Sequence, residues 1–518
     1  MISFLLVAGF GVYRGRVRLE TGSAETHSFT ISKGSFKSAH LVTAICISAA
    51  VALPALSADK VSAIPATEVA VGRDTLLNQN ATNDALEQIK RGTMYYEGEG
   101  VVQNYAEALR WFRLAAAHGN AKAQYNIGVL YDEGQGVTND YAEALKWYRL
   151  AAAQGYADAQ YNIGVIYGRG HGVAQDYAEA LKWYRLAAAQ GYADAQYNIG
   201  VMYDKGEGVT QNYAEALRWY RLAAAQGIAP AQANIGVMYD LGQGVTKDYV
   251  EALKWLRLAA AQGHANAQTS LGTKNFKGEG VTQNYAEALR WYRLAAAQGD
   301  SKAQNNIGVI FGKGHGVVQD YAEALKWYRL AATQGDADAQ YNLGSKYYMG
   351  QGVAQDYVEA VKWYRMAAGQ GDALAQTSLG MMYALGRGVT NDYVEAVRWH
   401  RLAAAKGNAS AQFNLGLGYA NGQGVAQDYV EAVRWYRLAA AQGNANAQYN
   451  LGLGYANGQG VAQDNKQAYL WLNLGAVDGT SEKVNRRDAI AKKMTPQQII
   501  QTQQMARDCQ QRNFKGCD

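Results

Sequence analysis

The most regular candidates for chemistry are basic and aromatic residues that follow one another in every repeat, as in the run from Lys146 to Arg149. Such a pattern can bind nucleic acid, because the cations contact phosphates and the rings stack on bases. Here acids such as Asp140 and Glu143 offset the charge in each copy, and Trp147 lies on the apolar side of the predicted helix. The run therefore predicts helix packing with ion pairs at the surface and no nucleic-acid binding.

Histidines and carboxylates also recur at positions that could suggest metal binding or acid–base catalysis. His171 and His315 occupy the same turn position four units apart, which is too far for two ligands of one metal ion. The glutamates from Glu107 to Glu431 are predicted to complete capping boxes with residues such as Asp140. The sequence contains no Ser-His-Asp arrangement, phosphate-binding loop or HExxH motif. We therefore predict no catalytic, cofactor-binding or metal-binding residues, and no enzymatic activity.

Positions that depart from the repeat are the better candidates for contacts with a partner. Residues 122, 125, 129 and 133, three or four apart, lie on one face of a predicted helix. This face changes character near residue 270 and again near residue 345. The candidate partner-binding residues there are Lys274, Phe276, Lys277, Lys346 and Tyr348. Neutral drift after duplication explains these departures as well as binding does, since solenoid surfaces tolerate change.

The tryptophans show which elements position these residues. All eleven lie on one 36-residue ladder, which runs from Trp111 to Trp471. A fixed period of this size is typical of a stacked repeat protein, in which each unit buries its apolar face against its neighbours. Function is therefore expected on a long surface and not in a single pocket.

Each unit reads as two short amphipathic helices, as residues 121–155 illustrate. Gly134 and Gly136 supply the positive φ that a tight interhelical turn requires, and Gly155 ends the second helix. Asp140 is the predicted N-cap of that helix. Gly128, in the middle of the first helix, is expected to mark the closest backbone approach between the paired helices.

The motifs of the unit, A-x-A-Q-x-x-(I/L)-G, G-x-G-V, (D/N)-Y-x-E-A, (K/R)-W and A-A-x-x-G, resemble the Sel1-like repeat, a relative of the tetratricopeptide repeat. The resemblance covers residues 84–479, and the first copy retains only Gln88, Gly92 and Tyr95 of the expected residues. It implies an all-α, right-handed α/α superhelical solenoid of about eleven 36-residue helix-turn-helix repeats. It also implies an adaptor or scaffold without a reaction of its own.

The N-terminal region indicates the compartment. Lys33 and Lys37 precede an apolar run over residues 41–56, and Ser57 and Ala58 supply a small-residue cleavage site. We therefore expect residues 1–58 to hold an N-terminal extension plus a signal peptide, and residues 59–83 to form a linker. The stretch before residue 33 is either a mistaken start or a real extension. Much of the net charge of +5 belongs to this leader. The mature protein is expected to be periplasmic or secreted, without a stable membrane span.

The C-terminal region, residues 480–518, is predicted to cap the array. Thr495 precedes a helix expected over residues 496–511, which should cover the apolar face of the last repeat. Cys509 and Cys517 are a candidate disulfide in an exported chain, and a pair of free thiols is the alternative.

These features favour an exported interaction scaffold that binds a protein partner, such as an envelope complex or a sensor component, along the concave surface of the solenoid. The alternative is a protein that binds envelope polysaccharide or peptidoglycan, for which the recurring tyrosines would offer stacking platforms. A third class consists of β-lactamase-like hydrolases with similar repeats. Their members carry paired cysteines in each repeat, and this array has none. We expect no cofactor.

Overall fold

The computed structural model describes residues 5–7, 12–14, 84–477, 479–514 and 516–517. The chain divides into two units, Met1–Gly72 and Arg73–Asp518. In the first unit, β1 (Leu5–Val7) pairs with β2 (Val12–Arg14) in an antiparallel hairpin with Leu6 opposite Tyr13. The sequence analysis did not anticipate this hairpin. The predicted signal sequence from residue 33 to residue 58 and the linker over residues 59–83 lie outside the described residues.

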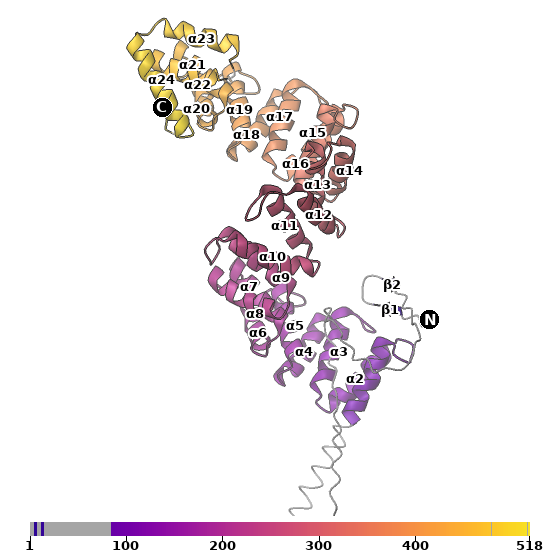
Figure 1. The fold of residues 1–518 in the computed structure, drawn as a ribbon. Helices are drawn as coiled ribbons and strands as arrows, with labels where there is room; N and C mark the ends of the chain where they lie inside the picture. Colours follow the sequence, from indigo (N-terminus) through magenta and orange to yellow (C-terminus); the bar gives the residue numbers. More distant parts are fainter. Residues whose placement is uncertain (1–4, 8–11, 15–83, 478, 515, 518) are drawn as a thin grey trace, which may run out of the picture. The chain divides into compact units, whose positions relative to one another are not determined.

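The described part of the second unit is an all-α solenoid of helix-turn-helix repeats, and each helix packs on the helix before it and the helix after it (Figure 1). A helix over residues 84–97 begins the array. The first helices of the following repeats are α3 (Ala121–Glu133), α5 (Ala157–Arg169), α7 (Ala193–Lys205), α9 (Ala229–Leu241), α11 (Ala265–Lys277), α13 (Ser301–Lys313), α15 (Ala337–Met349), α17 (Ala373–Leu385), α19 (Ala409–Asn421) and α21 (Ala445–Asn457). The second helices are α2 (Tyr105–Ala117), α4 (Tyr141–Ala153), α6 (Tyr177–Ala189), α8 (Tyr213–Ala225), α10 (Tyr249–Ala261), α12 (Tyr285–Ala296), α14 (Tyr321–Thr333), α16 (Tyr357–Gly369), α18 (Tyr393–Ala405), α20 (Tyr429–Ala440) and α22 (Asn465–Gly475).

The turns within and between repeats depend on glycine, as predicted. Gly134 and Gly136 have φ values of 69° and 70°, and Gly155 has a φ of 83°. A Cβ on Gly136 would lie 2.7 Å from the carbonyl carbon of Tyr105 in the preceding repeat. Gly136 thus lets the turn of one repeat touch the backbone of the previous one.

In most repeats the aromatic ring at the centre belongs to the residue after the tryptophan, and the exceptions are Leu256 and Leu472. Tyr148 is fully buried, whereas Trp147 is half-buried, and the same difference recurs from Trp111 to Trp435. Only at the end of the array is the tryptophan itself buried, at Trp471. Trp147 was predicted on the apolar side of its helix, yet it and its equivalents in most repeats are only half-buried.

Gly128 provides space for this tyrosine. A Cβ on Gly128 would lie 2.5 Å from Cδ1 of Tyr148, a distance at which one of the two groups must move. Gly200 stands in the same relation to Tyr220. The glycine therefore admits a flat ring between the paired helices. The predicted close backbone approach occurs as well, since a Cβ on Gly236 would lie 3.1 Å from the carbonyl oxygen of Ala252.

The glutamate of the first turn has a different role from the predicted one. Asp140 caps α4 by accepting a hydrogen bond from the backbone N–H of Glu143 at 3.0 Å. The carboxylate of Glu143 does not return to the cap, because it accepts hydrogen bonds from Trp147 Nε1 at 3.1 Å and Lys146 Nζ at 2.7 Å. The predicted reciprocal box is absent here. A complete capping box occurs at α24, between Thr495 and Gln498.

Buried glutamines join consecutive repeats. Gln154 Nε2 donates to Gln124 Oε1 at 2.8 Å, and Gln190 donates to Gln160 in the same way one repeat later. Gln160 thus accepts through Oε1, and its Nε2 donates to the carbonyl oxygen of Ala152 at 3.4 Å. Since a buried amide needs partners, this ladder favours one register between neighbouring repeats.

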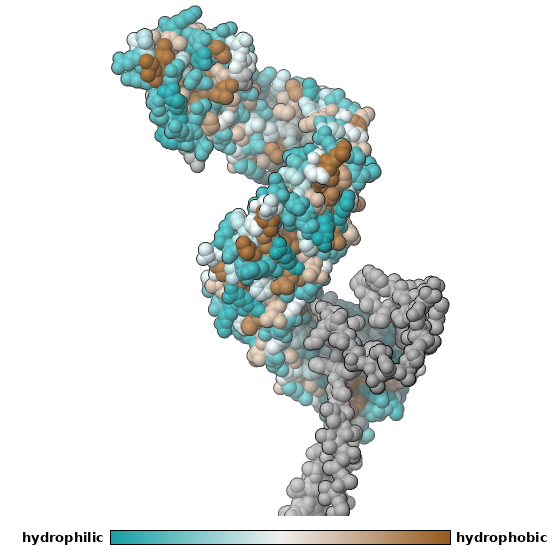
Figure 2. Space-filling model, in the orientation of Figure 1, coloured by the Kyte–Doolittle hydropathy of each residue, from teal (hydrophilic) through white to brown (hydrophobic). Residues whose placement is uncertain are grey.

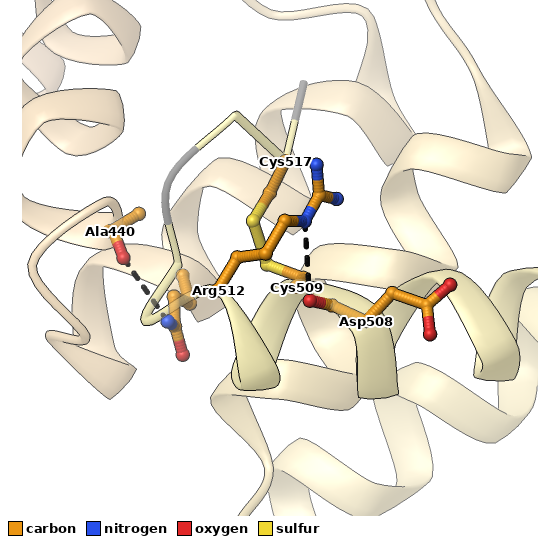
Figure 3. Close-up of a disulfide and its surroundings, with 6 residues drawn as sticks. Ala440, Asp508, Cys509, Arg512 and Cys517 are labelled. Atoms are coloured by element: carbon orange, nitrogen blue, oxygen red, sulfur yellow. Dashed lines mark hydrogen bonds between the residues drawn. A yellow bond between two sulfur atoms is a disulfide. The ribbon is translucent and has the colours of Figure 1, made fainter.

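Two helices close the C-terminal end of the array, at the yellow end of the ribbon in Figure 1. They are α23 (Ser481–Ala491), which was not predicted, and α24 (Pro496–Gln511), which matches the predicted helix. Ala506 and Cys509 of α24 join the core that contains Trp471. Cys509 forms a disulfide with Cys517, with the Cα atoms 5.5 Å apart, and Figure 3 shows this bond folding the tail back on the helix.

Candidate binding surface on the first helices

The candidate surface is the exposed side of the first helices, which we call the first-helix face. In α3 it carries the exposed residues Lys122 and Glu133 and the half-buried residues Tyr125 and Val129. The Tyr125 ring lies 5.1 Å from the ring of Tyr156, so only part of it faces solvent. On the side of the array visible in Figure 2, apolar side chains form small separate patches among hydrophilic ones. Specific departures from the repeat are therefore more informative than a general apolar stripe.

One buried position of the first helix divides the repeats into three groups. In α3 it is Leu130, and its equivalents recur every 36 residues. Most repeats place an apolar side chain there, two place lysine and two place glycine. The apolar members are Leu130, Ile166, Met202, Met238, Ile310 and Met382; the lysines are Lys274 and Lys346; and the glycines are Gly418 and Gly454. We call this the Leu130 position.

Lys274 is neutralised within the chain. Its residue is only 5% exposed, and Nζ contacts carboxylate oxygens of both Asp240 and Glu279, the latter at 2.6 Å. The hydrogen bond from Lys274 holds the pKa of Glu279 below its ordinary value. Nζ also lies 4.8 Å from the ring centre of Tyr249. Lys274 was expected on the surface, and that expectation was wrong, because two acids from neighbouring turns satisfy a buried ammonium.

The other two candidates of this repeat differ in exposure. Phe276 is half-buried and packs its ring against Tyr285 and His315, with ring centres 5.3 and 5.4 Å away. Lys277 is exposed, and its Nζ is 3.8 Å from Glu279. Phe276 thus serves mainly internal packing, and Lys277 is the member of this group that faces solvent.

Lys346 lacks such neutralisation. It is half-buried, Nζ donates to the amide oxygen of Gln351 at 2.7 Å, and the ammonium lies 4.5 Å from the ring centre of Tyr321. Burial and the nearby charge of Lys313 lower the pKa of Lys346. Tyr348, on the same helix, accepts a hydrogen bond from Arg387 Nη1 at 2.6 Å. The structure therefore gathers cations near Lys346 and Tyr348.

Cavities open on the first-helix face between consecutive repeats. One of about 210 Å³ lies between α5 and α7 and has the charged residues Arg169 and Glu207 in its wall. A second of about 210 Å³ and a third of about 270 Å³ lie side by side near the end of the array and share Leu417. Gly418 lines the second and Gly454 lines the third, and neither wall contains an aspartate, glutamate, lysine or arginine side chain.

His400 lines the second cavity in place of the tyrosine found at this point in most repeats. It is 4% exposed, its Nδ1 has no hydrogen-bond partner, and burial lowers its pKa to about 4. The ring is therefore neutral at pH 7. Where Tyr148 reaches Asp132 with its hydroxyl group, the equivalent of that aspartate here is Ala384. The cavity thus combines apolar walls with one unpaired imidazole.

The sequence analysis did not identify His400, Gly418 or Gly454. Aligning the repeats column by column would have found them, because glycine replaces a buried aliphatic residue and histidine replaces a buried tyrosine. Lys274 and Lys346 were predicted instead, because several unusual residues are contiguous in sequence around each of them.

The histidines considered for metal binding have packing roles. The ring centre of His171 lies 4.7 Å from that of Tyr141, and His315 stacks on Tyr285 at 4.8 Å. Among the described residues, no group of three or more histidine, cysteine, aspartate or glutamate side chains is arranged to hold a metal ion. Within the same residues, no helix has both the length and the apolar character needed to span a membrane.

Comparisons with known proteins identify the repeat. The family model for the Sel1 repeat matches eleven consecutive segments, from residues 88–120 to residues 445–476. A crystal structure of a protective antigen present in uropathogenic Escherichia coli strains, displaying an SLR fold, is 37% identical, with a TM-score of 0.70 over 86% of this chain and 95% of that one. A Sel1 repeat protein from Oxalobacter formigenes is 38% identical over 48% of this chain and 98% of its own, with a TM-score of 0.44. No curated protein matches the chain.

Proposed function

The chain belongs to the Sel1 repeat family, whose members are generally protein-interaction scaffolds, and on this premise we propose that it is an exported scaffold that binds a protein partner along the first-helix face. The scaffold acts by binding and catalyses no reaction. Its partner is a component of the cell envelope, such as an envelope complex or a sensor.

Three observations support export to the periplasm or beyond. The run from Lys33 to Ala58 has the charged, apolar and small-residue regions of a secretory signal. Cys509 and Cys517 form a disulfide, a bond that persists mainly in oxidising compartments. The similar E. coli protein is described as a protective antigen, which fits a protein outside the cytoplasm. N-terminal sequencing of the native protein tests the proposal. Cleavage near Ser57 or Ala58 is expected, and a mature chain that begins before residue 40 would contradict it.

The observation that carries the binding proposal is the pair of adjacent cavities lined by Gly418 and Gly454. The second cavity has a mainly apolar lining, which is typical of places where a partner side chain is anchored, whereas Asn421, Asn450 and Gln459 give the third cavity a mixed lining. Met381 and Leu385 at the rim of the second cavity are 38% and 56% exposed, so apolar surface extends from the cavity to solvent. We assign to these cavities two neighbouring side chains of one partner segment, with an apolar side chain in the second cavity.

Filling the cavities tests this assignment. The double variant Gly418→Leu/Gly454→Leu places in each repeat the side chain that Leu130 carries, so it should fold. A Cβ on Gly418 would meet Val397 Cγ2 and the Gln423 carbonyl oxygen at 3.3 Å, which requires only a small shift. Met238→Leu, a volume-conserving change of a buried residue at the Leu130 position, is the matched control.

The assay is capture from a cell-envelope extract by the immobilised mature chain and its variants. We expect a protein band that the parent and Met238→Leu retain and that the double variant loses by at least about tenfold, which corresponds to about 1.4 kcal/mol. Retention of muropeptides or polysaccharide without any protein band would contradict the proposal and favour glycan binding. Equal protein capture by the double variant would place the contact surface elsewhere.

A further inference from the structure

The two lysines at the Leu130 position lie in equivalent surroundings two repeats apart. Lys274 lies over the ring of Tyr249, and Lys346 lies over the equivalent ring of Tyr321. The hydroxyl group of Tyr292 donates to Thr273, and the hydroxyl group of Tyr364 donates to Ser345, at 3.1 and 3.2 Å. The chain therefore contains two copies of one lysine environment, which can be compared residue by residue.

The copies differ in their carboxylates. The positions of Asp240 and Glu279, which neutralise Lys274, are occupied by Gly312 and Gln351 around Lys346. A Cβ built on Gly312 would lie 3.9 Å from Lys346 Cε, so the space that an aspartate would fill adjoins the lysine. Gln351 offers Lys346 an amide oxygen without a charge. The half-buried ammonium thus has two neutral residues where its counterpart has two acids.

Lys313 increases the positive charge at Lys346, and Arg387 lies further along the same face. Lys313, which adjoins Gly312 in sequence, is exposed and acts on Lys346 electrostatically. In the next repeat, the position of Gln351 is occupied by Arg387, whose guanidinium lies 5.4 Å from the ring centre of Tyr357. Among the described residues, Lys313, Lys346 and Arg387 form no ion pair with an acid. An uncompensated cation in a partly buried place favours an anion from outside the chain.

We propose that Lys346, with Lys313 beside it and Arg387 against Tyr348 of the same helix, binds a carboxylate side chain of the partner protein. The carboxylate takes the place that Asp240 and Glu279 take around Lys274, and this equivalence is the reason for choosing a carboxylate over other anions. This inference rests on the proposed function, since it names the chemistry of one contact of the scaffold. The site complements the cavities near Gly418 and Gly454 in the same array.

A labelled peptide tests the site without knowledge of the partner. Fluorescence anisotropy of fluorescein-labelled tetraglutamate with the full chain, at low ionic strength, measures binding, and labelled tetraglutamine is the uncharged control. We expect saturable binding of tetraglutamate at least about tenfold tighter than that of tetraglutamine. Lys346→Met should weaken it at least tenfold, and this variant should fold because Met202, Met238 and Met382 occupy the equivalent position.

The internal copy provides matched controls. Lys274→Met should leave tetraglutamate binding within twofold of the parent, because Lys274 is already neutralised. Gly312→Asp with Gln351→Glu should weaken binding at least about tenfold, as Lys346→Met does, since the chain then supplies its own carboxylates. Asp240→Gly with Glu279→Gln should create a second site and raise the stoichiometry from one to two. Circular dichroism of each variant verifies the fold.

Several outcomes would overturn the assignment. The proposal fails if Lys346→Met leaves tetraglutamate binding intact, or if tetraglutamine binds equally well. Either result would show that Lys346 does not bind a carboxylate. If inorganic phosphate bound the parent chain and tetraglutamate did not, the ligand of the site would be a phosphate and not a carboxylate. The proposed scaffold function fails separately, when no protein is captured from the envelope extract. Capture that persists while tetraglutamate fails to bind would overturn only the carboxylate site.

Discussion

Replacing the two neighbouring aromatic residues of one repeat tests which of them forms the core. Tyr292 is 1% exposed, its ring fills the space left by Gly272, and its hydroxyl group donates to Thr273. Trp291 is half-buried, with the guanidinium of Arg290 5.3 Å from its ring centre. Tyr292→Ala should therefore cost about 3 to 5 kcal/mol through loss of packing and cavity formation. Trp291→Ala should cost about 1 to 2 kcal/mol, because less area returns to water.

Hydrogen exchange of the amides in α11 and α12 measures both effects. Repeat arrays open locally, so exchange reports the free energy of opening the altered repeat more directly than a global unfolding midpoint. Tyr292→Ala should accelerate exchange by at least about 100-fold, since each 1.4 kcal/mol is a factor of ten, and Trp291→Ala by about 5- to 30-fold. If Trp291→Ala accelerated exchange as much as Tyr292→Ala, the assignment of the buried ring to the tyrosine would be refuted.

Three further predictions follow from glycine, histidine and cysteine. Gly200→Ala should destabilise its repeat by about 1 to 3 kcal/mol, measured by hydrogen exchange, because a Cβ would lie 2.5 Å from the Tyr220 ring. Gly369→Ala is the control: a Cβ there would have no atom within 4 Å, so the change should be neutral or stabilising by up to about 1 kcal/mol. Burial lowers the pKa of His400 to about 4, so the unfolded chain binds a proton below about pH 6.5 that the folded chain does not. Hydrogen exchange in α17 and α18, corrected for intrinsic rates, should therefore speed up as the pH falls from 6.5 to 4. His400→Tyr should remove this pH dependence. Reduction of the Cys509–Cys517 disulfide should release the C-terminal tail and cost about 2 to 3 kcal/mol in the stability of the C-terminal cap, measured by limited proteolysis with and without reductant.

Much of the fold could be predicted because the repeat imposes the same constraints many times. The 36-residue period, the positive-φ glycines and the caps of the second helices each have one structural solution, and the structure contains it. Side-chain partners were harder to predict. Trp147 and Tyr148 are adjacent, so both lie near the apolar side of the helix, and periodicity does not say which one enters the core. The carboxylate of Glu143 has two possible donors within the same turn, a backbone N–H and the indole N–H of Trp147, and it accepts from the indole.

The candidate site could be predicted only in part for a related reason. Lys274 was placed at the surface because lysine is rarely buried alone. Its two acids, Asp240 and Glu279, are 34 and 5 residues away, and their approach is set by how consecutive repeats stack. Conversely, Gly418 attracts no attention by itself, since glycine is frequent throughout the chain. Its importance comes from the aliphatic side chain that the other repeats place at the same point.

Site-specific photo-crosslinking in the cell envelope tests the central claim that a protein partner binds the first-helix face. A photoreactive amino acid at Met381, at the rim of the cavity with His400, probes this face, and the same residue at Leu258, which is 51% exposed on a second helix, is the control. The proposed scaffold predicts a protein adduct from position 381 and none from position 258. An adduct from position 258 alone, or no protein adduct from either position, would contradict it.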